Sequence, residues 1–246
     1  MTELVHHSVA AGVATITLDS PGNRNALSRQ LVGELLEALE RSAALETTRV
    51  VLIRSADRVF CSGADLGEAS GGGMGEGARA LVELQRRIVS HPRPVVTRLD
   101  GPVRAGGLGL VASSDIVVCR DDVSFALTEV RLGLAAAVIS IPLRARISAR
   151  AASDWFLTGR AVDADEAREQ GLVTSVVPAG QLDARTARVL DDLRAGARQG
   201  LVEAKRLLNA DLVAAFDERG DEMARLSGLL FHSAVAKERM AAALRR

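Results

Sequence analysis

Apolar residues alternate with polar ones or form short runs through the first half of the chain, and they recur at helical spacing through the last third. Residues 3–7 and 12–18 predict a hairpin of two strands with its turn at Ala11 and Gly12. After a turn-rich loop, Ser28 is expected to cap a helix, because a serine hydroxyl accepts N–H groups left unpaired at a helix start. The leucines that recur on this helix are Leu31, Leu35, Leu36 and Leu39.

Further apolar segments are too short for helices and predict buried strands. They are residues 50–53, 95–99, 115–119 and 123–126. A helix is expected over residues 77–90, ended by the following prolines. The glycine-rich stretch 67–77 is expected to be mobile. Strands thus alternate with helices, and right-handed crossovers between parallel strands predict stacked βαβ-type units in an α/β fold.

From Ala151 onward the pattern is mainly helical. Residues 161–171 predict a short helix with a glycine stop, followed by a small strand over 172–177. Further helices are expected over residues 180–198, 200–209, 211–229 and 233–244. This tail has too little apolar core to stand alone, so we take residues 1–195 as the core and residues 196–246 as an appended helical region.

Two glycine-containing segments carry the candidate chemistry. The first is Phe60-Cys61-Ser62-Gly63-Ala64-Asp65-Leu66, and the second runs from Asp100 to Leu110. Each follows a predicted strand and turns into a predicted helix, which leaves unpaired backbone N–H groups at the helix start. Two such turns side by side can direct two N–H donors at one oxygen, which is the geometry of an oxyanion hole. Either turn alone would indicate only a tight helix entry.

Composition and charge argue against several classes of function. The 246 residues include 31 basic and 31 acidic ones, so no global field favours nucleic acid or an anionic membrane. Tyrosine is absent and aromatic residues make up 2%, which argues against base-stacking surfaces and excludes a tyrosine catalyst. No apolar stretch reaches the roughly 18–20 residues of a membrane span, and the first residues lack the features of a signal peptide. Cys61 and Cys119 are expected to be reduced packing residues of a cytoplasmic protein.

Taken together, the motifs resemble those of the crotonase family, the enoyl-CoA hydratases and isomerases. In order, they are Asn25-Ala26-Leu27-Ser28, Phe60 to Leu66, Gly101 to Asp115, Phe125 to Glu129, Leu157 to Arg160 with Ala164 to Ala167, and Gly171-Leu172-Val173 with Val176-Val177-Pro178. The resemblance covers nearly the whole chain. It implies a crotonase-like spiral of ββα units with a C-terminal helical trimerisation region, and hence a homotrimer or a homohexamer.

The resemblance also implies a substrate and a set of site residues. Family enzymes act on acyl-CoA thioesters and polarise the thioester carbonyl with two backbone N–H groups, which by motif position are those of Ala64 and Gly106. Gly107 is expected, with Gly106, to let the substrate approach the backbone closely. Asp65 is expected to cap the helix that follows it. The residues expected to line the CoA groove are Arg24, Asn25, Ala26, Ser62, Asp65 and Leu66.

One position departs from the hydratase pattern. Enoyl-CoA hydratases carry two glutamates, and the first corresponds here to Gly109, which has no side chain to move a proton. The second corresponds to Glu129, the candidate general acid/base, whose apolar motif neighbours predict a raised pKa. The stretch from Glu129 to Ser140, together with Gly109, resembles the branch that contains the methylglutaconyl-CoA hydratases.

Three functions therefore stay open. The branch resemblance favours addition of water across the 2,3 double bond of an enoyl-CoA, with Glu129 serving both proton steps. Gly109 favours a Δ3-Δ2 enoyl-CoA isomerase, because one carboxylate that removes and returns a proton is enough for that reaction. A non-catalytic acyl-CoA binder is the third, and Glu129 together with the intact pair of turns argues against it.

No metal or prosthetic group is expected. The histidines, His6, His7, His91 and His232, are scattered without ligand spacing. The run Gly106-Gly107-Leu108-Gly109 does not match the dinucleotide-binding fingerprint. Coenzyme A is thus expected only as the carrier part of the thioester substrate, in an enzyme of fatty acid metabolism or a related acyl-CoA pathway.

Overall fold

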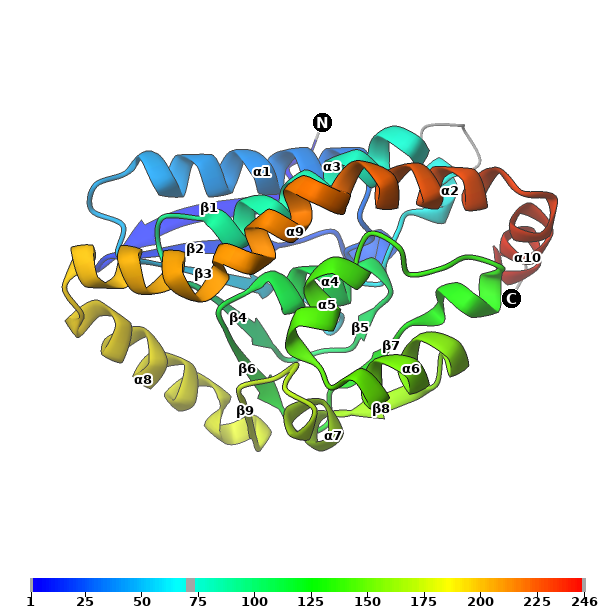
Figure 1. Cartoon of the computed structure of the whole chain (residues 1–246). Helices are drawn as coiled ribbons and strands as arrows, with labels where there is room; N and C mark the ends of the chain where they lie inside the picture. The colour runs from blue at the N-terminus through cyan, green and yellow to red at the C-terminus, as the bar shows by residue number, and fades with distance from the viewer. Residues whose placement is uncertain (1, 70–73, 245–246) are drawn as a thin grey trace.

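The computed structural model describes residues 2–69 and 74–244, and its centre is a six-stranded sheet (Figure 1). The strand order is β1-β2-β3-β4-β6-β9, with β1 and β2 antiparallel and the later neighbours parallel. The strands are β1 (Val5–Ala10), β2 (Val13–Leu18), β3 (Val50–Ser55), β4 (Val95–Leu99), β6 (Ile116–Arg120) and β9 (Ser175–Val177). Within the described ranges a second sheet has the order β5-β7-β8, formed by β5 (Val103–Arg104), β7 (Ser124–Ala126) and β8 (Ala161–Asp163).

Helices cover both faces of the large sheet, which explains why its central strands read as continuous apolar runs. Successive side chains of β3 point to opposite faces. Val51 and Ile53 join the main core, which includes residues of α1 (Arg29–Ala44), α3 (Met74–Ser90) and α4 (Gly106–Ser113). Val50 and Leu52 instead pack with residues of α8 (Leu182–Ala195) on the other face.

The C-terminal part is helical, and its long helix packs against α3 and α5 (Ser140–Arg146) of the same chain. Figure 1 shows α9 (Arg198–His232) running along α3 and ending at α10 (Ala234–Leu244). Leu212 and Phe216 of α9 pack with Val89 and Ile141. The remaining elements are α2 (Leu66–Ala69), α6 (Ala149–Thr158) and α7 (Ala164–Glu169), with 3-10 turns η1 (Pro21–Asn23), η2 (Thr128–Leu132) and η3 (Ala179–Gln181).

A buried ion pair fixes the start of α9 to the core. Lys205 Nζ lies 2.7 Å from Asp115 Oδ2 and also donates to the carbonyl oxygens of Ile88 and Arg93, at 2.9 and 3.1 Å. The Lys205 side chain is 7% exposed. Burial lowers the pKa of its ammonium group, and the Asp115 carboxylate opposes that shift. The pair thus ties α9 to the segments around α3 and β4. The division of the chain into a core of residues 1–195 and an appended helical region of residues 196–246 stays a prediction.

Several sequence predictions are confirmed at the level of single residues. Residues 95–99 form β4, and the Oγ of Ser28 caps α1 by accepting the Leu31 N–H at 3.2 Å. The hairpin forms, although its first strand runs over 5–10 instead of 3–7. The helix predicted from residue 77 begins at Met74. The predicted mobility of 67–77 falls partly on residues 70–73, which lie outside the described residues.

Two predictions for the second half are wrong. Residues 161–163 are strand β8 and not the start of a helix, because they pair antiparallel with β7. Asp163 then caps α7 by accepting the Glu166 N–H at 2.8 Å. The two helices predicted over 200–209 and 211–229 are one helix, α9, and the sequence between them contains no glycine or proline to end it.

Candidate active site

The two glycine-containing turns lie side by side, as the sequence predicts. They follow β3 and β4, which are parallel neighbours and end at the same edge of the sheet. Backbone hydrogen bonds join the two segments: the Phe60 N–H donates to the Pro102 oxygen at 3.1 Å, and the Arg104 N–H donates to the Cys61 oxygen at 2.9 Å. Tight packing at Gly101 requires glycine, because a Cβ there would lie 1.9 Å from the Arg58 oxygen.

The backbone N–H groups of Ala64 and Gly106 have no hydrogen-bond acceptor among the described residues. Gly106 is the first residue of α4, and Ala105 before it has φ 47° and ψ −123°, a costly conformation for a residue with a Cβ. Gly63 has φ 97°, and a Cβ on it would lie 2.8 Å from the Ala105 Cβ. Contact between these two turns therefore fixes the directions of both donors.

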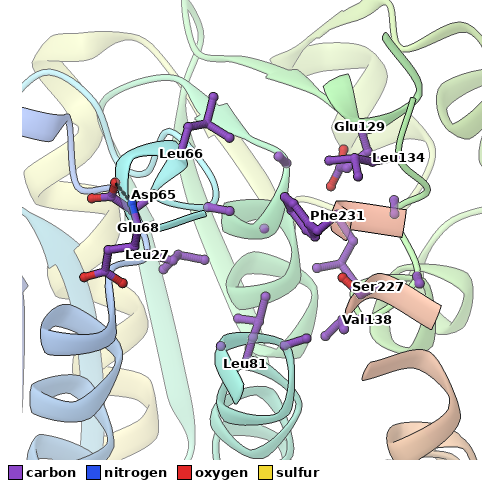
Figure 2. A pocket seen from close by; sticks show the side chains of 18 of the residues that line it. Leu27, Asp65, Leu66, Glu68, Leu81, Glu129, Leu134, Val138, Ser227 and Phe231 are labelled. Atoms are coloured by element: carbon purple, nitrogen blue, oxygen red, sulfur yellow. Dashed lines mark hydrogen bonds between the residues drawn. The ribbon is translucent and has the colours of Figure 1, made fainter. Parts of the chain in front are cut away.

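A cavity of about 300 Å³ is lined by Ala64, Gly106 and Glu129 together. Figure 2 shows side chains entering it from two sides. Asp65 and Glu68 lie on one side, with the first turn, and Glu129 lies on the other, with Phe231 of α9. The cavity thus brings the two unpaired N–H groups and one carboxyl group into a shared space.

Glu129 is the carboxyl group on the far side of this cavity. It belongs to η2, directly after β7, and its Oε2 is buried without a hydrogen-bond partner among the described residues. Burial raises its pKa to about 7, and a backbone N–H bond to its carboxylate opposes the shift. The predicted rise in the pKa of Glu129 is therefore supported.

Gly109, the position of the missing first glutamate, does not line the cavity. It lies within α4, and a Cβ on it would be 2.9 Å from the Oε1 of Gln85 on α3. Gln85 is fully buried, and its Oε1 has no hydrogen-bond partner in the described part of the chain. Neighbouring side chains therefore fill the space that a glutamate would enter.

Three of the residues predicted to contact CoA line the cavity: Ser62, Asp65 and Leu66. Asp65 also holds its loop, as predicted. Its Oδ1 accepts the N–H groups of Gly67 and Glu68, at 2.9 and 3.3 Å, and its Oδ2 accepts from Asn23 Nδ2 at 3.0 Å. These bonds fix the segment that follows the Ala64 donor.

The other predicted contact residues, Arg24, Asn25, Ala26 and Gly107, do not line the cavity. Asn25 is 1% exposed, and its side chain accepts the Ser20 N–H and donates to the Val59 oxygen. Its side chain therefore braces the loop, and the expected contact of this segment with CoA stays a prediction. At Gly107 a Cβ would lie 2.8 Å from the Cys61 Cβ, so its missing side chain allows close core packing, and its expected role in the approach of substrate stays a prediction.

Sequence analysis missed the residues that complete the cavity wall. Leu81 and Val138 line it, as do Ser227 and Phe231 of α9. Apolar residues at helical spacing indicate burial but not the surface they pack against, so their sequence pattern carried no signal for a cavity. Among the described residues no group of three or more His, Cys, Asp or Glu side chains could hold a metal ion. The described helices include none long and apolar enough to cross a membrane.

Comparison with known proteins agrees with this arrangement. The enoyl-CoA hydratase/isomerase family model matches residues 8–244. The crystal structure of an enoyl-CoA hydratase from Mycobacterium avium superposes with a TM-score of 0.92 at 40% identity, and the match covers 100% of this chain and 97% of that one. The chain therefore has the crotonase fold. It belongs to the enoyl-CoA hydratase/isomerase family.

Relatives within the family differ in their named reactions. The 4-chlorobenzoyl coenzyme A dehalogenase-2 of Arthrobacter sp is 33% identical over 202 residues, which cover 78% of this chain and 73% of that protein. The mitochondrial enoyl-CoA hydratase domain-containing protein 3 of Mus musculus is 34% identical over 183 residues, which cover 72% of this chain. The match spans 61% of the mouse protein's own length. Family membership thus leaves the particular reaction to be argued from the site.

Proposed function

We propose that this protein is an enoyl-CoA hydratase that binds the thioester oxygen between the Ala64 and Gly106 N–H groups and moves protons with Glu129. The observation that carries this proposal is the shared cavity. It contains two unpaired N–H donors and one buried carboxyl group whose Oε2 has no partner among the described residues. Donors placed in this way stabilise negative charge that develops on the thioester oxygen, and losing one such donor typically costs about 10²–10³ in rate.

Hydration requires a base for water and an acid for carbon, and Glu129 serves as both. The Glu129 carboxylate takes a proton from water while the water oxygen bonds to C3 of the 2-enoyl thioester. The electrons of the double bond move into an enolate whose oxygen accepts the two N–H groups. The protonated Glu129 then returns the proton to C2. A pKa of about 7 suits both steps, because the group can hold or release a proton near neutral pH.

Isomerisation of a 3-enoyl-CoA is the second candidate, and the filled space around Gly109 favours it. Here Glu129 takes a proton from C2, a conjugated dienolate forms with its oxygen at the same two N–H donors, and the proton returns to C4. The double bond moves from the 3- to the 2-position without any water. One carboxylate is sufficient, so the reaction needs nothing at position 109.

The proposal also covers the cofactor requirement, the oligomeric state and the cellular location of the protein. Coenzyme A serves as the carrier of the substrate, and the chemistry above requires no prosthetic group. We expect a homotrimer or homohexamer in the cytoplasm, in fatty acid or related acyl-CoA metabolism. Exposed leucines on α9 support self-association: Leu207, Leu208 and Leu229 are 69%, 82% and 60% exposed.

The test compares the wild-type protein with Glu129→Gln on crotonyl-CoA and on a 3-enoyl-CoA. If the wild-type protein removes the 2-enoyl thioester absorbance of crotonyl-CoA and Glu129→Gln does not, the result would support a hydratase. A gain of that absorbance from the 3-enoyl substrate alone would support the isomerase. Glu83→Gln is the matched control, because Glu83 is a partly exposed residue of α3 that pairs with Arg87 and lies outside the cavity lining. Tight binding of both thioesters without turnover would leave the non-catalytic acyl-CoA binder as the remaining candidate function.

A further inference from the structure

The two sides of the cavity differ in charge. The ionisable lining residues on the side of the first turn are Arg29, Asp65, Glu68 and Glu76. They are linked to one another: the Arg29 N–H donates to Glu68 Oε2 at 2.9 Å, and the Arg29 guanidinium lies 3.8 Å from Glu76. This side therefore carries three carboxylates and one guanidinium group.

The opposite side is apolar around Glu129. We call it the acyl chamber and define it by Glu129, Leu134, Val138, Ser227 and Phe231, which line the cavity and lie together in Figure 2. Glu129 is the one ionisable side chain of the chamber, and Ser227 is a neutral hydroxyl. In the proposed function the thioester oxygen binds at the Ala64 and Gly106 donors, and an acyl group that extends from there toward Glu129 enters this chamber.

Packing holds the chamber walls in place. Leu134 is 7% exposed and belongs to a cluster with Ala236 and Met240 of α10, against which Phe231 also packs. Val138 is buried with Ala78 and Ala224. The loop that carries Glu129 contacts α10 directly, because a Cβ on Gly133 would lie 2.9 Å from Val235 Cγ1. Helix α9 therefore forms part of the chamber wall, and α10 packs behind it.

We propose that the acyl chamber selects an uncharged acyl group and rejects one that ends in a second carboxylate. The inference rests on the proposed function and narrows its substrate class. A buried carboxylate needs a cation or several donors to replace its water. Among the described lining residues the one cation is Arg29, whose side chain is 72% exposed and paired with Glu76 on the opposite side. A second carboxylate in the chamber would also repel ionised Glu129.

This inference separates the chain from the methylglutaconyl-CoA hydratases that the stretch from Glu129 to Ser140 resembles. The substrate of those enzymes carries a carboxylate at the end of its acyl group. Similarity of that stretch does not by itself transfer the substrate, because Ser227 and Phe231 of α9 also form the chamber and lie outside the stretch.

Binding of two saturated thioesters tests the inference without catalysis. Isovaleryl-CoA and 3-methylglutaryl-CoA share the branched chain and differ by one terminal carboxyl group, and neither has a double bond to react. We expect isovaleryl-CoA to bind at least about 10²-fold more tightly to the wild-type protein by calorimetry, since an unpaired buried charge is costly. Equal dissociation constants would overturn the chamber inference alone. Failure of both to bind would overturn the proposed acyl-CoA function and the inference with it.

A charge introduced in the chamber provides the second arm. Ser227→Arg places a cation there, and Ser227→Met is the control of similar length without charge. We expect the arginine variant to bind 3-methylglutaryl-CoA at least about 10-fold more tightly than the methionine variant does. Equal binding by the two variants would show that charge does not set the selection and would overturn the inference.

Discussion

The side chain of Ile139 lies where a side chain at Gly109 would begin: a Cβ on Gly109 would be 2.6 Å from Ile139 Cγ2. Fully buried Gln85 closes the same space from α3. The position at which hydratases of this family carry their first glutamate is thus filled by neighbouring side chains. The departure from the hydratase pattern therefore includes the side chains that pack around Gly109, in addition to the missing carboxylate. In the proposed function Glu129 serves alone.

Overpacking at Gly109 should destabilise the fold. We expect Gly109→Ala to lower the free energy of unfolding by about 1–3 kcal/mol, because Ile139 and Gln85 must move to accept a Cβ. Urea unfolding measures the change. Gly33→Ala is the matched control, since Gly33 also lies in a helix and a Cβ there would meet nothing within 4 Å. Equal stability of wild type and Gly109→Ala would contradict the close packing. Gly109→Glu is expected to fail to increase hydration of crotonyl-CoA.

A substitution that pushes the two glycine-containing turns apart should lower the catalytic rate while the protein still folds. Gly63→Ala adds a Cβ that would lie 2.8 Å from the Ala105 Cβ, at a residue with φ 97°. The turns must shift, and the Ala64 and Gly106 donors no longer converge on one oxygen. We expect kcat to fall by about 10²-fold, as when one donor of an oxyanion hole is lost. Steady-state kinetics checks this, with Gly22→Ala as the control at an open position. An unchanged kcat in Gly63→Ala would argue against the two-donor site.

The raised pKa of Glu129 predicts how stability depends on pH. Its pKa is about 7 in the folded protein, against an ordinary value of 4.5. The folded state therefore binds more protons between these values, and the contribution of Glu129 to stability is lost as pH rises from about 4.5 through about 7. Glu129→Gln lacks this loss. The measured quantity is the free energy of unfolding of Glu129→Gln minus that of wild type. We expect this difference to be about 3 kcal/mol larger at alkaline pH than at acid pH. Urea unfolding on both sides of this range measures the difference, and a difference that is constant with pH would refute the burial of an ionisable carboxyl group.

Removal of the buried cation at the start of α9 should be costly. Lys205→Met leaves the Asp115 carboxylate without its ion-pair partner and removes donors from the Ile88 and Arg93 carbonyls. We expect a loss of about 3–5 kcal/mol in the free energy of unfolding, typical of a broken buried pair. Lys237→Met is the control, because that lysine is exposed on α10. Similar unfolding midpoints for the two variants would show that the pair does not hold α9 to the core.

Much of the fold and part of the site follow from local patterns. The apolar runs predict the central strands, the Ser28 cap is read from one residue, and the glycine-containing turns place Ala64 and Gly106 at helix starts. Boundaries were less accurate, because hydrogen bonds between distant segments decide them. Residues 161–163 look helical in isolation and become a strand because β7 lies beside them.

By itself the sequence determined the family, the alternation of strands and helices, the pair of turns and the carboxyl group at Glu129. These features depend on residue type and spacing along one segment, which a sequence displays directly. Only the tertiary structure decided that Ile139 and Gln85 fill the space at Gly109, that Gly107 packs on Cys61, and that Phe231 and Ser227 reach the cavity from α9. Periodicity tells that a side chain is buried, but its neighbours are set by how elements far apart in the chain pack together.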